Sequence, residues 1–571
     1  MTNARDASNA KRPWLASYPP ETAASLDYPR ENAARMLEDA AARFPLHPAV
    51  EFLGARYTYT ELLAFCRRFA NGLKRRGIGK GDRVAIMLPN CPAAVIAYFG
   101  TLMAGAIVVQ TNPLYTAPEL KRQLCDSGAA VLVTLDELFS RFSAVRPETK
   151  VRLALIASIA DELPWPKSWL YSIRLRRDKS YANAVRAAAD TADTVRLSAL
   201  LKDSPASHVM EPVDAEADLA LLQYTGGTTG AAKGVMLTHA NLIANVRQIA
   251  AWCYRSQYGQ ERYLAALPLF HVFGLTTLMN LSVLRAGELV LLPRFEAGTV
   301  LRAIRRKKPA IFPGAPTMYI ALLNHPQLHR YDLSSIELCV SGSASLPLEV
   351  QERFEALSGA RLIEGYGLTE ASPVTHCNPI WGRRKTGSIG IPLPDTEAKI
   401  VDPDTGEEAA PGTIGELAVR GPQVMKGYWG RPEETEQVLK DGWLYTGDMG
   451  TMDEDGYFAI VDRKKDIIIA GGYNIYPREV EEALYEHPAV REAAVAGVPD
   501  AYRGETVKAY IVLKEGADAG ETEIEAFCRE RLAAYKVPRL YEFRRELPKT
   551  MIGKVLRRAL IAEEPDRRDG E

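Results

Sequence analysis

The first 135 residues alternate between the spacing of apolar side chains typical of helices and that typical of strands. Apolar positions in residues 33–44 share one helical face, and residues 49–53 follow as a short apolar run. The pattern continues as helix 60–75 with Thr60 as its N-cap, strand 83–88, helix 92–104, strand 106–110, helix 118–126 and strand 129–135. Repeated strand–helix–strand units predict an α/β fold, with a mostly parallel sheet covered by helices on both faces.

Residues 91–109 carry no charged side chain and are almost long enough to span a bilayer. However, Asn90 and Pro92 are typical of the N-cap and first position of a helix, and Gly105 is typical of a helix end. The apolar residues after Gly105 then predict a buried strand. The pattern therefore favours a helix followed by a core strand over a membrane span.

Residues 224–234 read Tyr-Thr-Gly-Gly-Thr-Thr-Gly-Ala-Ala-Lys-Gly and lie between two apolar runs. Glycines allow the backbone N–H groups to approach a ligand, threonines add hydroxyl donors, and Lys233 adds a positive charge. Such a loop suits phosphate. It is not a Walker A loop, because Gly234 follows Lys233 where that motif needs serine or threonine. The alternative is a surface turn, but the flanking apolar runs predict strands that present the loop.

Residues 136–216 are less regular, and within them residues 163–177 combine Trp165, Trp169 and a tyrosine with basic side chains. This composition is typical of an interfacial membrane contact. The alternative is an ordinary loop whose aromatic side chains fill a local core. Pro164 and Pro166 interrupt a long amphipathic helix and favour this alternative.

The pattern changes again in the second half of the chain. Strand–helix alternation resumes to about residue 380, and residues 387–461 have many short strands and turns, which predict a β-rich subdomain at the end of an N-terminal domain spanning 1–461. Five consecutive charged residues at 462–466 predict a hinge. The remainder, 467–571, predicts a small, mobile α+β domain with helix 477–486, strand 507–513, and helix 523–533 opened by a capping box of Thr522 and Glu525.

Composition narrows the class of protein. The formal net charge of −1 over 571 residues gives no global attraction for nucleic acid or for anionic membrane, so any polyanion needs a local site. The seven cysteines show no Cys-x-x-Cys spacing, which is typical of a reducing cytoplasm and argues against a structural zinc site. The first residues are polar, so no signal peptide is expected.

Further short motifs contain chemically useful residues. These are residues 267–274 around His271, the small-residue turns 341–345 and 364–370, residues 442–448 ending in Asp448, and residues 547–558 around Lys554. Together with the loop at 224–234, and in this order, they resemble the adenylate-forming superfamily of acyl-CoA synthetases over about residues 25–562. The stretches 112–116, 461–466 and 472–477 are most similar to the branch of bacterial long-chain-fatty-acid–CoA ligases.

The resemblance implies two reactions, with ATP, Mg²⁺ and coenzyme A as the other participants. In the first, a fatty carboxylate attacks the α-phosphorus of ATP, and positive charge stabilises the transition state. The resemblance assigns catalysis to Lys554, Lys233, Thr369 and Glu370, with Glu370 also holding Mg²⁺. It assigns ATP binding to Thr225, Gly226, Gly227, Thr228, Thr229, Gly230, Lys233, Gly342, Ser343, Ala344, Glu364, Gly365, Tyr366, Gly367, Thr369, Asp448, Arg463 and Lys554.

In the second reaction, the thiol of coenzyme A attacks the acyl-adenylate after the C-terminal domain rotates about Lys465. The resemblance implies a pantetheine channel at Gly471, Gly472 and Tyr473. It also implies an acyl pocket at His271, Val272, Phe273, Gly314 and Ala315. Each buried methylene contributes about 0.8 kcal/mol, so a deep pocket would favour long chains.

Several alternatives remain open at this stage. The acceptor of the acyl group is coenzyme A or a carrier protein, and a non-catalytic binding protein is a third interpretation. From composition alone, Lys554 is equally well a solvated lysine of a basic tail. A cytoplasmic location is expected, with a peripheral contact on the inner face of the membrane and a homodimer left open, and no nucleic acid partner is expected.

Overall fold

The computed structural model describes residues 12–176, 193–207, 210–225, 232–470, 473–500, 503–550 and 554–563. The chain forms two compact units. Unit 1 consists of Met1–Ala16, Ala398–Val419 and Trp443–Glu571, and unit 2 consists of Ser17–Glu397 and Arg420–Gly442. Because unit 1 contains residues on both sides of position 461, this division of the chain does not separate the two predicted domains. The predicted boundary at 461 and the hinge at 462–466 therefore stay predictions.

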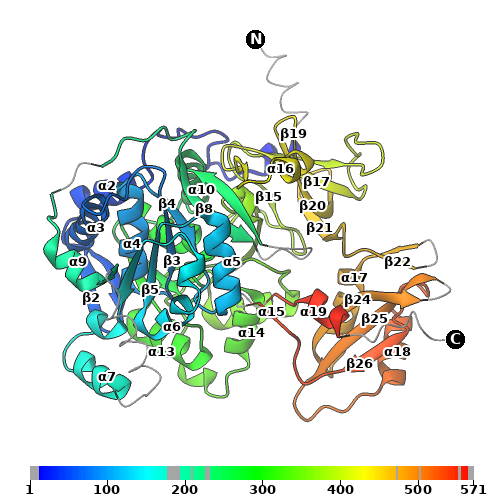
Figure 1. The fold of residues 1–571 in the computed structure, drawn as a ribbon. Helices are drawn as coiled ribbons and strands as arrows, with labels where there is room; N and C mark the ends of the chain where they lie inside the picture. Colours follow the sequence, from blue (N-terminus) through cyan, green and yellow to red (C-terminus); the bar gives the residue numbers. More distant parts are fainter. Residues whose placement is uncertain are drawn as a thin grey trace. The chain divides into compact units, whose positions relative to one another are not determined.

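An eight-stranded sheet forms the centre of unit 2, in the order β18-β9-β8-β4-β3-β5-β6-β7 (Figure 1). From β8 to β7 each strand is parallel to its neighbour, whereas β9 is antiparallel to both of its neighbours, β8 and β18. Two of the strands, β6 and β7, come from the region that looked irregular in sequence. The strands are β3 (Arg83–Met87), β4 (Ile107–Gln110), β5 (Val131–Leu135), β6 (Leu153–Ala157), β7 (Thr194–Arg196), β8 (Leu219–Thr225), β9 (Lys233–Thr238) and β18 (Gly427–Tyr428).

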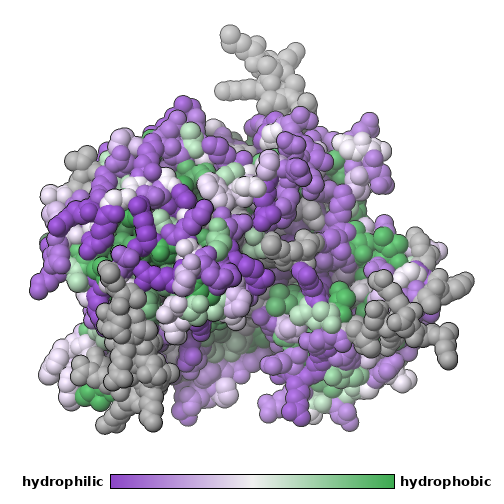
Figure 2. All heavy atoms as spheres, in the orientation of Figure 1, coloured by the Kyte–Doolittle hydropathy of each residue, from purple (hydrophilic) through white to green (hydrophobic). Residues whose placement is uncertain are grey.

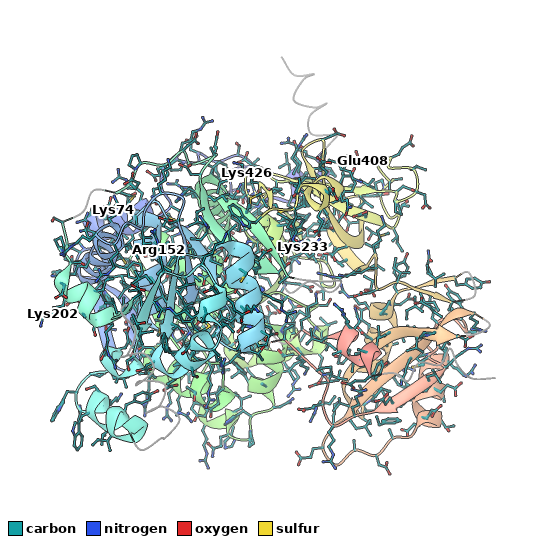
Figure 3. The ribbon with its side chains drawn as sticks, viewed as in Figure 1. Lys74, Arg152, Lys202, Lys233, Glu408 and Lys426 are labelled. Carbon is teal, nitrogen blue, oxygen red and sulfur yellow. The ribbon has the colours of Figure 1, made fainter. Side chains whose placement is uncertain are left out.

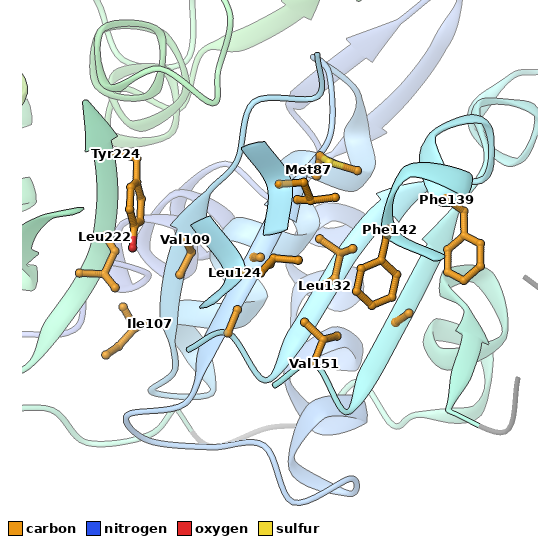
Figure 4. Packing of buried hydrophobic residues seen from close by; sticks show 14 of the residues in the cluster. Met87, Ile107, Val109, Leu124, Leu132, Phe139, Phe142, Val151, Leu222 and Tyr224 are labelled. Atoms are coloured by element: carbon orange, nitrogen blue, oxygen red, sulfur yellow. The ribbon is translucent and has the colours of Figure 1, made fainter. Parts of the chain in front are cut away.

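Helices α5 (Ala117–Ser127) and α6 (Phe139–Ser143) cover one face of this sheet (Figure 4). Their Leu124 and Phe142 pack in one buried cluster with Val109 and Leu222 from the strands. Helix α4 (Pro92–Met103) is buried along its whole length and contacts β3 and β4. The sheet is thus covered on both faces, and the predicted helix followed by a core strand is confirmed.

A second set of strands in unit 2 runs in the order β10-β11-β1-β2, and a third in the order β12-β13-β14-β15. Ile311 bridges Tyr263 of β10 and Leu338 of β12, both in parallel, and so connects the two sets. The strands are β1 (Pro48–Phe52), β2 (Ala55–Thr58), β10 (Arg262–Ala265), β11 (Glu288–Leu291), β12 (Leu338–Ser341), β13 (Arg361–Gly367), β14 (Val374–Cys377) and β15 (Ile391–Pro392).

The remaining helices of unit 2 lie around these sheets. They are α2 (Arg35–Arg43), α3 (Tyr59–Lys74), α7 (Lys167–Arg176), α9 (Leu197–Asp203), α10 (His239–Trp252), α11 (Val272–Gly274), the π-helical turn Leu275–Asn280, α12 (Leu281–Leu284), α13 (Ala297–Lys307), α14 (Pro316–Leu323), α15 (Leu348–Ser358) and α16 (Pro432–Val438).

Unit 1 contains two sheets. In one, β17 (Gly415–Arg420) and β21 (Phe458–Arg463) both pair with β20 (Trp443–Met452), and β16 (Glu397–Val401) lies beside β17. The other contains β22 (Ile468–Ala470), β23 (Tyr473–Ile475), β24 (Val490–Asp500), β25 (Gly504–Leu513) and β26 (Leu540–Phe543), with helices α17 (Pro477–Tyr485), α18 (Glu521–Arg529) and α19 (Arg557–Ala562). The second sheet and its helices form the α+β arrangement predicted from the sequence.

Three predicted helix starts are wrong in detail. The N-cap of α3 is Thr58, whose hydroxyl accepts from Glu61 in a full capping box, so the helix begins before the predicted Thr60. The N-cap of α4 is Cys91, because the Asn90 side chain instead donates to the backbone of Ala265 and Leu267. Gly520 caps α18, which leaves Thr522 inside the first turn.

The two tryptophans of the segment 163–177 do not fill a local core. Trp165 is 84% exposed and Trp169 is 59% exposed, so the interpretation that the prolines favoured is wrong. Pro164 and Pro166 precede α7 rather than interrupting it. Among the described residues, no helix has both the length and the apolar character needed to cross a membrane.

Candidate active site

The predicted phosphate loop connects two paired strands of the central sheet. Thr225 ends β8 and lies opposite Lys233, which begins β9 and is labelled in Figure 3. The residues Gly226, Gly227, Thr228, Thr229 and Gly230 fall outside the described residues. The sequence prediction that strands present this loop is confirmed, because both flanking apolar runs are strands of the sheet.

Long-range contacts fix the base of this loop. The Tyr224 hydroxyl donates to Asp126 Oδ2 at 2.6 Å, and Arg431 lies 3.4 Å from the other oxygen of the same carboxylate. A Cβ on Gly234 would lie 3.1 Å from the Tyr224 ring, and the Gly234 carbonyl accepts from the Trp429 N–H at 2.8 Å. Glycine at 234 therefore allows three chain segments to meet closely behind the loop.

Lys233 and Glu370 share a neighbour that the sequence analysis did not identify. The Tyr428 hydroxyl donates to Glu370 Oε1 at 2.8 Å, and the Lys233 ammonium lies 4.9 Å from the centre of the Tyr428 ring. Lys233 also forms an ion pair with Glu434. Burial and the adjacent Glu370 raise the pKa of Tyr428 above its ordinary value, so the hydroxyl stays a donor. The feature of the sequence that could have indicated this contact is a glycine followed by two aromatic residues at 427–429.

Backbone contacts hold Glu370 in a short turn after β13. Thr369 and Glu370 lie in the 3₁₀ turn Thr369–Ala371, and the Glu370 carbonyl accepts from the Met425 N–H at 2.8 Å. A Cβ on Gly367 would lie 2.1 Å from the carbonyl oxygen of Pro373. Any side chain at 367 would force this turn open, so the glycine fixes the direction in which the Glu370 segment leaves the strand.

The small-residue turn at 341–345 follows β12, but the predicted turn at 364–370 is wrong in part, because residues 364–367 are the last residues of the neighbouring parallel strand β13. β12 ends at Ser341 and β13 ends at Gly367, and Ser341 pairs with Glu364. The carboxyl ends of parallel strands lie on one edge of a sheet, so residues 342–344 and 368–370 emerge together. Ser343 has a φ of +74°, a left-handed conformation that is uncommon for a side-chain-bearing residue and marks a constrained turn.

The residues at the end of β13 are held by identifiable neighbours. The Glu364 carboxylate accepts from the Leu346 N–H at 3.4 Å, and the Tyr366 ring meets the buried His376 edge-on at 6.0 Å. A Cβ on Gly365 would lie 3.0 Å from the Val340 side chain, so this position is close-packed. Ala344 follows Ser343 in the exposed part of the first turn.

The predicted acyl-pocket residues adjoin these turns. His271 caps α11, where its Nδ1 accepts from the Phe273 N–H at 3.3 Å, and Val272 and Phe273 are buried. A Cβ on Gly342 would lie 3.2 Å from Phe273 Cζ, and the Gly342 N–H donates to the Gly314 carbonyl at 3.2 Å. The predicted acyl and adenine segments are therefore in contact within unit 2.

Gly314 and Ala315 are closely packed against neighbouring residues and do not leave the open space of a wide tunnel entrance. A Cβ on Gly314 would lie 3.0 Å from the Tyr319 ring, and Ala315 is buried at the N-terminus of α14. The Tyr319 hydroxyl donates to the Phe312 carbonyl at 2.9 Å, which fixes the ring in this position. The small residues here accommodate Tyr319, so their size is not by itself a sign of an acyl tunnel.

A second cluster of predicted residues lies within unit 1. Asp448 on β20 pairs with Arg463 on β21, and Arg463 Nε lies 3.2 Å from Asp448 Oδ1. Burial, and then the like charge of Arg463, lower the pKa of Lys554 to about 8, while Asp448 and Asp466 oppose this shift. Lys554 is half-buried and has charged neighbours, so its environment differs from that of a fully solvated lysine, and its role stays a prediction.

A half-buried arginine, Arg557, connects the Lys554 segment to the predicted hinge. Arg557 lies 2.8 Å from Glu481, 3.2 Å from Asp466 and 3.6 Å from Asp462. Burying a guanidinium is costly unless carboxylates surround it, so these ion pairs and hydrogen bonds hold α19 against residues 462–466. Lys465 is exposed in the turn between β21 and β22.

The predicted pantetheine channel is only partly described. Gly471 and Gly472 fall outside the described residues, whereas Tyr473 is 58% exposed and stacks on Tyr535 with the ring centres 4.7 Å apart. The two stacked rings lie at the surface, and Tyr473 directly follows the glycine pair in sequence.

Comparison with known proteins identifies the family. A model of the AMP-binding enzyme family matches residues 37–429, and a model of the AMP-binding enzyme C-terminal domain matches residues 479–554. The chain belongs to the AMP-binding enzyme family. Its large α/β part and its smaller α+β part together form the fold of adenylate-forming enzymes.

Individual relatives of this AMP-binding enzyme are similar over nearly their whole length. A long-chain-fatty-acid–CoA ligase of Bacillus subtilis (strain 168) is 54% identical, covering 98% of this chain and 99% of the relative. A long-chain-fatty-acid–CoA ligase of Escherichia coli O157:H7 is 41% identical, with 97% and 98% covered. The crystal structure of ATP-bound MatB from Rhodopseudomonas palustris has a TM-score of 0.81 at 31% identity, with 93% and 98% covered.

We expect Lys554 to titrate near pH 8 in the free enzyme, far below an ordinary lysine. Trace acetylation across pH 6–11, followed by peptide mass spectrometry, measures this midpoint, because only the neutral amine reacts. Lys80, whose pKa is raised by Asp218, is an internal reference that should react only at higher pH. Arg463→Gln removes a like charge and should raise the Lys554 midpoint. A midpoint near 10.5 in the wild type would contradict this account of the cluster.

Proposed function

We propose that this AMP-binding enzyme is a long-chain-fatty-acid–CoA ligase, which converts a fatty acid, ATP and coenzyme A to acyl-CoA, AMP and pyrophosphate through an acyl-adenylate. The observation that carries the proposal is the 54% identity to a long-chain-fatty-acid–CoA ligase across 99% of that relative. The clustering of Lys233, Tyr428 and Glu370 in one unit, and of Lys554, Arg463 and Asp448 in the other, supports it.

The first reaction brings two anions together, so its residues must supply positive charge. Lys233 and the loop after Thr225 bind the terminal phosphates of ATP, with backbone N–H groups as the main donors. Lys554 supplies its charge to the α-phosphate and the attacking carboxylate, where negative charge develops. Tyr366 and the turn 342–344 hold the adenine ring, and Asp448, supported by Arg463, accepts the ribose hydroxyls.

Glu370 would hold Mg²⁺ as its carboxylate ligand, with phosphate oxygens and waters completing the coordination. Among the described residues, no group of three or more His, Cys, Asp or Glu side chains could hold a metal ion. When bound, Mg²⁺ neutralises phosphate charge. Tyr428 orients the carboxylate by donating to Oε1, and Thr369 precedes it in the same turn.

The second reaction transfers the acyl group to a thiol. We propose that the chain turns about Lys465 between the two reactions, and that Gly471, Gly472 and Tyr473 line the path of the pantetheine arm. His271, Val272 and Phe273 position the carboxyl end of the fatty acid, with no proton transfer assigned to His271. A homodimer and a location in the cytoplasm remain predictions from the sequence.

Fatty acids from octanoate to oleate, with either coenzyme A or an acyl carrier protein as acceptor, test the proposed substrates. AMP release should require coenzyme A, and kcat/KM should rise about four-fold for each added methylene that the pocket buries, from about 0.8 kcal/mol each. Activity with the carrier protein alone would identify an acyl-AMP ligase instead. No pyrophosphate exchange with any fatty acid would identify a non-catalytic relative.

Lys554→Ala should reduce adenylation by at least 100-fold, because it removes the charge that stabilises the transition state. Conversion of supplied acyl-AMP to acyl-CoA should stay within a few-fold of the wild type. Pyrophosphate exchange and thioester formation measure the two reactions separately. Lys549→Ala, which removes a cation paired with Glu492 in the same segment, is the matched control. Equal loss of both reactions would mean that Lys554 has a structural role.

Lys465→Pro should have the opposite effect, because proline fixes φ and restricts the residue before it. Pyrophosphate exchange should continue while acyl-CoA formation falls by at least ten-fold. Lys465→Ala removes the same side chain but leaves the backbone free, so it should behave as the wild type. If the proline variant makes acyl-CoA at the normal rate, the hinge lies elsewhere.

A further inference from the structure

An apolar patch projects from unit 2 at the start of α7. We define the aromatic patch as Trp165, Trp169 and Leu170, which are 84%, 59% and 56% exposed. Figure 2 shows hydrophobic and near-neutral atoms at the lower left edge of this face, where Figure 1 shows α7. Tryptophan has a large apolar ring with one polar N–H, and this combination is favoured where an apolar phase meets water.

A groove of about 320 Å³ adjoins this patch. We define the basic groove by its floor, Val290, Leu291 and Leu292 of the β11 segment, and by the cations on its walls. The cations are Lys167 from α7 and Arg302, Arg306 and Lys307 from α13. An apolar floor with a cationic rim suits an amphiphilic anion better than a small hydrophilic one.

The charge of the basic groove is only partly neutralised. Lys307 lies 2.6 Å from the buried Glu51, whose same oxygen also accepts from the Gly54 N–H at 2.8 Å. Within the part of the chain that the structure describes, no ion pair includes Lys167, Arg302 or Arg306. Three positive charges therefore remain on the rim of the groove.

Patch and groove are physically connected. Lys167 donates to the Leu53 carbonyl at 2.6 Å, and a Cβ on Gly54 would lie 3.7 Å from Pro164 Cγ. These contacts attach the start of α7 to the edge of the groove. Lys167, which lies between the two tryptophans in sequence, therefore lines the groove together with the cations of α13.

We propose that this face docks the enzyme on a bilayer of anionic phospholipid. The basic groove binds the phosphate of a lipid headgroup, and the aromatic patch enters the interface beside it. Charge complementarity selects this occupant: the chain has a net charge of −1, yet four cations line this one groove, and exposed tryptophans flank one of them, Lys167, in sequence. The proposal is independent of the catalytic assignment, because lipid binding needs neither ATP nor turnover.

Flotation with vesicles tests the proposal. The full-length protein should bind vesicles containing 30% phosphatidylglycerol at low salt, bind weakly to pure phosphatidylcholine, and dissociate from the anionic vesicles above physiological salt. Vesicles carrying bromine on the acyl chains should quench tryptophan fluorescence. Failure of the wild type to float with anionic vesicles at low salt overturns the proposal.

Paired variants separate the two parts of the surface. Arg302→Gln with Arg306→Gln should weaken partitioning about 30-fold, from about 1 kcal/mol for each charge. Arg330→Gln with Arg353→Gln removes two exposed arginines elsewhere in unit 2 and should leave partitioning unchanged. Equal partitioning of the two double variants overturns the assignment of the basic groove.

Trp165→Ala with Trp169→Ala should weaken partitioning at least ten-fold and abolish the quenching by brominated lipid. Leu46→Ala with Leu114→Ala is the matched control, because these leucines are 81% and 59% exposed. Thermal unfolding should be the same in all four double variants. If the tryptophan variant instead converts a dimer to a monomer in sedimentation without vesicles, the face is a contact between copies of this chain and the proposal is wrong.

Discussion

A sheet that is buried on both faces leaves only its strand ends for polar chemistry, and this constraint organises unit 2. Along β8, Leu221 and Leu222 are fully buried, so a charged group cannot be accommodated within the strand, which ends at Thr225. The carboxyl ends of β12 and β13 likewise lead into the turns 342–344 and 368–370, although Glu364 and Tyr366 are paired residues within β13 itself. Most candidate residues of unit 2 therefore gather at the ends of strands or just beyond them.

In unit 1, the cations Arg463, Lys554 and Arg557 lie close to one another and are only partly shielded from water. Arg463 is balanced by Asp448, and Arg557 is balanced by Glu481 with Asp462 and Asp466 nearby. Lys554 lies beside these pairs, and burial together with Arg463 outweighs the attraction of the carboxylates, so the pKa of Lys554 falls. The arginines thus take most of the compensating negative charge, and Lys554 is left poorly compensated.

Local sequence patterns predicted much of the fold, whereas the features that they missed depend on long-range contacts. Alternation of apolar residues predicted the order of strands and helices from α2 to β5 except for the short strand β2, and the apolar runs around residues 224–234 correctly predicted a loop between strands. In contrast, Tyr428 reaches Glu370 across 58 positions of sequence, and Asp126 reaches Tyr224 across 98. The spacing of apolar residues along the sequence does not predict such a contact. The exposure of a side chain also depends on distant parts of the chain: the prolines 164 and 166 favoured a local core, yet Trp165 faces solvent.

The lowered pKa of Lys554 is consistent with a residue whose charge is needed only when an anion is present. In the free enzyme, the ammonium is destabilised by burial and by Arg463. An α-phosphate and a carboxylate next to the same nitrogen would favour the charged form and raise its pKa again. Binding of the substrates would therefore be coupled to retention or uptake of a proton, most strongly above pH 8. The ammonium would then interact most strongly where negative charge develops, which is the requirement for catalysis rather than for tight binding of the ground state.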